Sequence, residues 1–355
     1  MWVEISKDIF ETADYQGLSY IFQILNWYPK SLPRYKLFIN TEEIKNTNNY
    51  NKFKESIPDF DSIIDQQFNE FVQSTSNGEQ CKYKITNLKG NFFFNIEESI
   101  RYFSQPISII LENNKNDAYF IKAIFNHIDQ NKVLQEYVNN GWIKFENAGG
   151  CLNVKNFIEG ELNSYEDLAS RNGRDLHDYY RVFILLDSDL EFCTQPQKPN
   201  YKQLIDYLTD INLTSNNFHI LSKRMMENYM PDEVYKDLKI EYQSQSSKQI
   251  LVKWINAYLL LSDEQKNFLN VKDGFSKEKD EMGNRKPLKP EIIALYSNIV
   301  GENYDIIDKG FKYPDFKNSF SELFEKSERI NKQSLQQRAN SPELEDIIQK
   351  IKNLI

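Results

Sequence analysis

The chain has 355 residues, more than one typical hydrophobic core accommodates, so we expect two or three compact parts. Hydrophobic residues make up 40% and aromatic residues 14% of the sequence, which excludes an intrinsically disordered chain. The formal net charge is −9 and the pI is about 5.2, which argues against a stand-alone nucleic-acid-binding protein with a basic surface. Any nucleic-acid-binding function would need a local basic patch or a partner protein that grips the phosphates.

The cysteines and histidines give no sign of a disulfide framework or a zinc site, because both sets are scattered and odd in number. They are Cys81, Cys151, Cys193, His127, His177 and His219. A signal-peptide pattern and a long apolar segment are both missing from the sequence, so we expect a cytoplasmic protein that does not contact a membrane.

Residues 1–105 form a mixed α/β N-terminal region in our interpretation. A helical spacing of apolar residues predicts a helix over Phe60–Val72. The segment Lys45–Lys52 is rich in Asn and Lys, and we interpret it as a loop. The expected strands are Tyr35–Ile39, Lys82–Ile85 and Phe92–Phe94. The region contains no pattern that points to chemistry.

Residues 106–231 alternate between strand and helix patterns, which is typical of βαβ units and a parallel sheet flanked by helices. The apolar runs Ile107–Leu111 and Val182–Leu186 indicate strands buried on both faces. The remaining expected elements are strands over 142–146 and 218–221 and helices over 116–128, 153–170 and 202–209. Residues 232–355 are predicted to be helical, and the final helix starts after Ser341-Pro342.

Both buried strands end in carboxylates. Glu112 follows the first, and Asp187-Ser188-Asp189 follows the second. In an open parallel sheet, ligands bind beyond the carboxyl ends of the strands. If the two strands are neighbours, Glu112, Asp187 and Asp189 converge at one edge and repel one another unless a hard cation joins them. Oxygen-only ligands favour Mg²⁺ or Mn²⁺ there.

This arrangement resembles the Toprim domain, the topoisomerase–primase fold, whose core is a glutamate ending one strand and an Asp-x-Asp ending a later one. Gly149-Gly150 follows the strand over 142–146, where Toprim nucleases of the OLD family and their relatives carry a glycine turn. The segment FHILSKRMMENYMP, Phe218–Pro231, looks like the Lys/Arg-x-x-Glu-Asn-Tyr segment of bacterial Toprim nucleases that work beside ABC-type ATPases. The resemblance covers roughly residues 106–231.

The resemblance implies a Mg²⁺- or Mn²⁺-dependent endonuclease of bacterial anti-phage defence, acting on DNA or RNA, including a tRNA, with an ABC- or AAA-type ATPase partner. Besides the three strand-end acids, it implies Asp117 and Glu227 as metal ligands, and Lys223 or Arg224 as the contact to the scissile phosphate. Glu191 is a further ligand candidate, because it alternates with the two aspartates. A homodimer is left open.

Two other classes remain open. Asp187-x-Asp189 also resembles the motif with which nucleotide-sugar-dependent glycosyltransferases hold Mn²⁺, although that interpretation leaves Glu112 unexplained. A non-catalytic interaction subunit could keep the fold, although it has no need to hold repelling carboxylates together. A haloacid-dehalogenase phosphatase is disfavoured, because Leu190 and Glu191 follow the second aspartate where that motif expects threonine or valine.

Overall fold

The computed structural model describes residues 1–25, 34–275, 287–312, 314 and 316–355. By their internal contacts these residues divide into two compact units. The first comprises Met1–Ile107, Gly160–Arg181 and Ile355, and the second comprises Ser108–Glu159 and Val182–Leu354. The chain therefore leaves the second unit after residue 159 and returns to it at β7, the strand that Asp187 directly follows.

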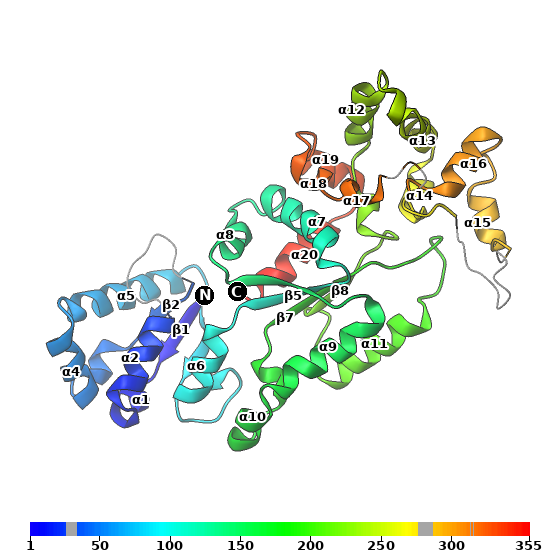
Figure 1. Cartoon of the computed structure of the whole chain (residues 1–355). Coiled ribbons are helices and arrows are strands. Elements are labelled where there is room, and N and C mark those ends of the chain that lie inside the picture. The colour runs from blue at the N-terminus through cyan, green and yellow to red at the C-terminus, as the bar shows by residue number, and fades with distance from the viewer. Residues whose placement is uncertain (26–33, 276–286, 313, 315) are drawn as a thin grey trace. The chain divides into compact units, whose positions relative to one another are not determined.

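The first unit contains a parallel sheet with the strand order β2-β1-β3-β4 among its described residues, flanked by helices (Figure 1). Its core is aromatic: the rings of Phe22, Phe53 and Phe60 pack against one another. The strands are β1 (Trp2–Ile5), β2 (Lys36–Phe38), β3 (Cys81–Ile85) and β4 (Phe93–Phe94). The helices are α1 (Lys7–Thr12), α2 (Tyr15–Ile24), α3 (Thr41–Ile44), α4 (Asn48–Ser56), α5 (Phe60–Thr75), α6 (Ile96–Ser104), α10 (Glu166–Asn172) and the 3₁₀ turn η1 (Leu176–Tyr179).

The second unit is built on a sheet with the order β6-β5-β7-β8. Its strands are β5 (Ile107–Leu111), β6 (Ile143–Asn147), β7 (Val182–Leu186) and β8 (Phe218–Ile220). The helices around this sheet are α7 (Asn114–His127), α8 (Val133–Asn139), α9 (Cys151–Asn163), α11 (Pro199–Asp210) and α20 (Glu343–Lys352). Figure 1 shows α7 and α20 on one face of the sheet and α9 and α11 on the other.

The rest of the second unit is helical, as expected for the C-terminal part of the chain. These elements are η2 (Met226–Tyr229), α12 (Asp232–Tyr242), η3 (Ser246–Lys248), α13 (Gln249–Leu259), α14 (Asp263–Phe268), α15 (Pro290–Leu295), α16 (Glu302–Lys309), α17 (Lys317–Phe320), α18 (Leu323–Lys326) and α19 (Lys332–Ala339). Here η2 and η3 are 3₁₀ turns.

Strand β7 pairs in parallel with β5 on one side and with β8 on the other. Every residue of β5 and β7 is buried, which agrees with the apolar runs in the sequence. Because Leu111 pairs with Leu185, the two strands end at the same edge, and the residues that follow them emerge side by side. The predicted α/β class, with a parallel sheet flanked by helices, is confirmed, and the N-terminal region contains a second parallel sheet that was not predicted.

The structure of the N-terminal region differs from the sequence analysis in one wrong prediction and one omission. Most of the segment Lys45–Lys52, predicted to be a loop, belongs to helix α4, which runs over Asn48–Ser56. Its N-cap Thr47 accepts a hydrogen bond from the backbone N–H of Tyr50. Tyr50 and Phe53 are buried one helical turn apart, and their burial outweighs the polar composition. Strand β1 at Trp2–Ile5 was not anticipated, although it lies in the interior of its sheet.

Candidate functional site

The carboxylates that follow β5 and β7 meet at the edge of the second sheet. The hydroxyl of Tyr201, from α11, lies 3.3 Å from Oε1 of Glu112 and 3.4 Å from Oδ2 of Asp189. A single phenol group therefore contacts an acid from each strand end. Lys198 adds a cation 3.4 Å from Oδ2 of Asp189 at the more exposed side of the cluster.

The Asp187-Ser188-Asp189 turn is held by the segment that follows β8. The backbone N–H groups of Ser188 and Asp189 both donate to the carbonyl of Arg224, at 3.1 and 2.9 Å. The Ser188 hydroxyl donates to the carbonyl of Lys223 at 2.8 Å. Asp189 has a φ of 55°, a left-handed conformation that aspartate tolerates better than most residues. These contacts fix the turn that orients both aspartates.

Asp117 and Glu227 face Asp187 from α7 and η2. The backbone N–H of Met226 donates to Oδ1 of Asp187 at 2.9 Å, which brings the neighbouring Glu227 to the same place. Burial, together with the charges of Glu227 and Glu112, raises the pKa of Asp117 to about 7. Burial, followed by the charges of Asp117, Glu227 and Glu112, holds the pKa of Asp187 well above its usual value. Acids from four segments are therefore close enough for their charges to influence one another.

Glu112 connects this group to the Tyr201 contact. Burial raises the pKa of Glu112 to about 7, and the charge of Asp189 contributes in the same direction. The Tyr201 hydroxyl and the backbone N–H groups of Asp187 and Cys151 oppose that shift. Cys151 opens α9 directly after Gly149 and Gly150, which have φ of 72° and 111°. The glycine turn thus places a helix N-terminus beside Glu112 through a backbone conformation that other residues adopt with strain.

Lys272 is a cation that lies among Glu112, Asp117, Asp187 and Glu227, which we call the acidic group. Its Nζ is 2.5 Å from Oε1 of Glu227, and the Glu227 side chain is only 3% exposed. The charges of Glu227, Asp187 and Asp117 all raise the pKa of Lys272 and outweigh its burial. Ser321 donates to the same oxygen of Glu227 at 3.3 Å. One lysine therefore offsets part of the repulsion among the acids.

Lys223 and Glu191 contact other partners. The Lys223 Nζ donates to Oδ1 of Asn267 at 2.6 Å and lies over the ring of Tyr229. Burial, together with the nearby Arg338, lowers the pKa of Lys223 to about 7. The buried Glu191 forms an ion pair with Lys289. Arg224 donates from Nη1 to the carbonyl of Phe268 at 3.3 Å.

The acidic group has the donor chemistry of a hard-cation site, because its side-chain donors are carboxylate oxygens. Glu112, Asp117, Asp187 and Glu227 are the residues that could hold Mg²⁺ or Mn²⁺, with Asp189 next to Glu112. Within the described ranges no three His, Cys, Asp or Glu side chains stand in metal-holding geometry. The carboxylates of the acidic group instead contact Tyr201, Lys272 and backbone N–H groups. Metal binding therefore requires some of these contacts to be replaced by contacts to the metal.

Sequence reasoning missed Lys272 and Tyr201. Lys272 belongs to the C-terminal region, to which we assigned no chemistry, and a lysine in the sequence NVKDG carries no distinguishing signal. Tyr201 is the third residue of α11, which begins at Pro199, and so it lies just outside the helix predicted over 202–209. A buried tyrosine close after an Asp-x-Asp was the available signal, but the sequence contains 21 tyrosines.

No family model, no curated protein and no solved structure matches the chain. The Toprim resemblance consequently depends on the residues quoted above. Among the residues that the structure covers, no helix combines the length and the apolar character needed to cross a bilayer.

Proposed function

We propose that the protein is a Toprim-type, metal-dependent endonuclease whose centre is the edge of the second sheet beyond β5 and β7. The observation that supports this most strongly is the gathering of Glu112, Asp117, Asp187 and Glu227 at one sheet edge, where burial first, and then the charges of neighbouring acids, raise the pKa of Glu112, Asp117 and Asp187. Buried like charges are costly, and a fold that keeps them together has a use for them, most simply as cation ligands.

Each residue has a defined part in this proposal. A bound divalent cation would activate a water molecule and stabilise the leaving oxygen of a phosphodiester. Glu112 and Asp187 hold the site from the two strand ends, and Asp117 and Glu227 complete it from α7 and η2. Lys272 keeps the acids together without metal and supplies positive charge next to the scissile phosphate, the role that the Toprim resemblance implied for Lys223 or Arg224. The Lys223-Arg224 backbone instead holds the Asp-Ser-Asp turn.

A partner completes the proposal. With a net charge of −9, the chain is poorly suited to gripping phosphates alone. An ATPase partner of the kind found beside Toprim nucleases of anti-phage defence would provide that grip and control activation. The substrate is DNA or RNA, including a tRNA.

The test is cleavage of single- and double-stranded DNA and of RNA by the full chain with Mg²⁺ or Mn²⁺, alone and with any ATPase that is encoded next to its gene. We expect metal-dependent nicking or degradation that is lost in both Glu112→Ala and Asp187→Ala. Cleavage that survives both substitutions would remove the assigned centre. Hydrolysis of nucleotide sugars by the same preparation would favour the glycosyltransferase alternative.

A further inference from the structure

A pocket of about 500 Å³ lies directly beside the proposed centre, within the second unit. Ser188, which separates Asp187 from Asp189, lines this pocket together with Leu190. The turn that orients the two aspartates is therefore also a wall of the pocket. A strand whose phosphate reached the acidic group would place an adjoining part of the same molecule here.

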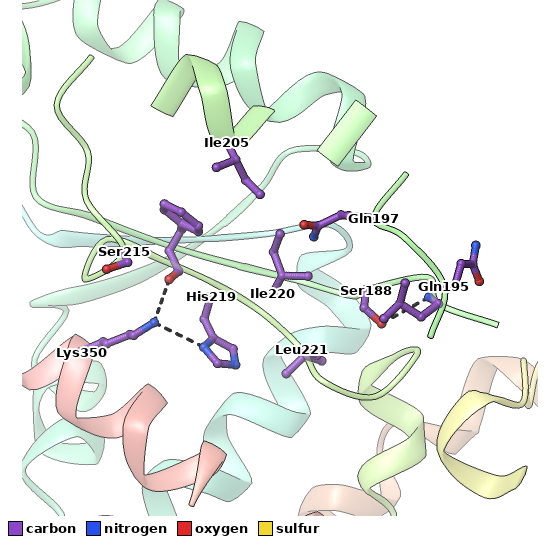
Figure 2. Close-up of a pocket in the computed structure, with 11 residues that line it drawn as sticks. Ser188, Gln195, Gln197, Ile205, Ser215, His219, Ile220, Leu221 and Lys350 are labelled. Atoms are coloured by element: carbon purple, nitrogen blue, oxygen red, sulfur yellow. Dashed lines mark hydrogen bonds between the residues drawn. The ribbon is translucent and has the colours of Figure 1, made fainter. Parts of the chain in front are cut away.

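The chemistry of the pocket differs sharply from that of the acidic group. The described residues that line it include no acid, and they include one cation, Lys350. Ile205 and Ile220 supply apolar walls, and Gln195 and Gln197 supply amides. Figure 2 shows Ile205 on the opposite side of β8 from Lys350, with Gln197 beside Ile220. Apolar walls with a few polar groups form the usual lining of a site for a flat, uncharged organic group.

The edge of β8 adds hydrogen-bonding groups to this pocket. Asn217 and Leu221 form backbone hydrogen bonds with β7. Because the direction of the backbone groups alternates along a strand, the N–H and C=O groups of Phe218 and Ile220 point away from β7, toward the open edge. Lys350 donates to the carbonyl of Phe218 at 3.2 Å. The N–H and C=O of Ile220 thus form a donor and an acceptor side by side, matching the edge of a nucleobase. Gln195 accepts the Glu191 N–H at its Oε1, which leaves its amide nitrogen as a donor.

We infer that this pocket receives one unpaired nucleobase of the strand whose phosphate lies at the acidic group, an inference that rests on the proposed nuclease function. A base inside it cannot remain stacked in a duplex, so the protein selects a single-stranded or flipped-out nucleotide. An added peptide strand is the weaker occupant. Strand β8 has only three residues, and Lys350 already takes its Phe218 carbonyl, a common protection of an edge strand.

The experiment measures binding of the full chain to fluorescein-labelled oligonucleotides by anisotropy, with Ca²⁺ in place of Mg²⁺. The probes are a mixed-sequence single strand of about twelve nucleotides, the same strand with abasic sites throughout, and the corresponding duplex. We expect the single strand to bind roughly tenfold more tightly than either of the others, since each bound base contributes substantially to affinity. Equal affinity for the abasic strand would overturn the inference.

Substitutions at residues that line the pocket test whether it causes the preference for the intact single strand. Ile205→Trp fills the pocket and should remove the preference for the intact single strand. Gln203→Trp, at an exposed position of the same helix, is the matched control and should retain it. Gln197→Ala, in an exposed loop where folding is not at risk, should weaken discrimination among poly-dA, poly-dC and poly-dT. Wild-type preferences in both Ile205→Trp and Gln197→Ala would contradict a base in this pocket.

Cleavage with Mg²⁺ separates this inference from the function it rests on. If the protein cleaves nucleic acid but shows no dependence on bases or on Ile205, the pocket assignment fails and the nuclease assignment stands. If it neither binds nor cleaves any of the probes, alone or together with an ATPase partner, both fail together.

Discussion

The two sheets of this protein share an all-parallel plan of pairing but use their carboxyl ends differently. In the first sheet, the residues beyond the strands satisfy one another. Asp8 accepts hydrogen bonds from the Thr86 hydroxyl and the Asn87 N–H, and Asn95 forms a capping box with Glu98. In the second sheet, Glu112 and Asp187 face further carboxylates, and burial with like charge raises the pKa of both.

The difference shows that an acid at a strand end is weak evidence for function by itself. Asp8 lies near the end of β1 and has the partners that a structural carboxylate needs. What distinguishes the second sheet is the concentration of acids from four segments around one lysine. A comparison between Asp8 and the acidic group therefore provides matched tests.

The largest expected contrast is between Asp187→Asn and Asp8→Ala. We expect Asp187→Asn to reduce metal-dependent cleavage by roughly a thousandfold, because several kcal/mol of transition-state stabilisation depend on metal ligation. Asp8→Ala should leave the cleavage rate of the folded protein unchanged while lowering the free energy of unfolding by about 1–3 kcal/mol through its lost hydrogen bonds. Steady-state cleavage and denaturant titration measure the two effects. Similar losses of cleavage in both variants would mean that the carboxyl ends of the second sheet have no specific role in cleavage.

The next contrast concerns the lysine at the centre of the acids. Lys272→Met removes the partner of the buried Glu227 and should lower the free energy of unfolding by about 3–5 kcal/mol in EDTA. Mg²⁺ should restore part of that loss, because it supplies positive charge to the same carboxylates. Urea denaturation with and without Mg²⁺ reports both. A loss that is the same in EDTA and in Mg²⁺ would indicate an ion pair unrelated to metal binding.

The pH dependence of stability should follow from the raised pKa values of Asp117 and Glu112, both about 7 against 3.8 and 4.5 for the unfolded groups. The folded state holds these protons more tightly, so stability falls as pH rises from about 4, and the loss is complete at about pH 8, above the folded pKa values. The metal-free protein should melt several degrees lower at pH 8 than at pH 6. Added Mg²⁺ should raise the melting temperature more at pH 8, where the ligands are ionised.

Asp117→Asn should flatten this pH profile, and Asp8→Ala should not. Differential scanning calorimetry over this pH range measures both variants. An unchanged slope in Asp117→Asn would mean that the acid does not titrate in the group as described.

The smallest expected effect is that of Tyr201→Phe. Loss of the hydroxyl removes a donor from both Glu112 and Asp189, at a cost of about 0.5–1.5 kcal/mol in stability. The pKa of Glu112 should rise further, so the pH at which cleavage is half-maximal should move upward. A pH–rate profile shows the shift, and Tyr207→Phe on the same helix is the matched control. Identical profiles would remove Tyr201 from the site.

The sheet around the site could be predicted from the sequence because its signals are local. The runs Ile107–Leu111 and Val182–Leu186 are apolar at every position but one, Ser108, and only burial on both faces accommodates them. Their adjacency was a condition of the predicted site, and the pairing of β5 with β7 meets that condition. The helix α4 was missed because its composition is polar, although the Tyr50 and Phe53 spacing carried a helical signal.

The remainder of the acidic group depends on contacts that sequence order does not specify. Glu227 and Lys272 are brought together by the helical part of the second unit, whose packing has no periodic signature. Lys223 faces Asn267 because η2 and α14 pack together, and the sequence does not reveal which side chain of the Lys-Arg-x-x-Glu segment turns inward. Long-range partners of charged residues are decided by tertiary packing.

The central claim is that the acids beyond β5 and β7 bind a divalent cation, and Mn²⁺ binding followed by electron paramagnetic resonance tests it most directly. The account predicts saturable binding to the wild-type chain and to Asp8→Ala, with severe loss in Asp187→Asn and in Glu112→Gln. Mn²⁺ binding that is absent from the wild type, or unchanged in both site variants, would contradict it.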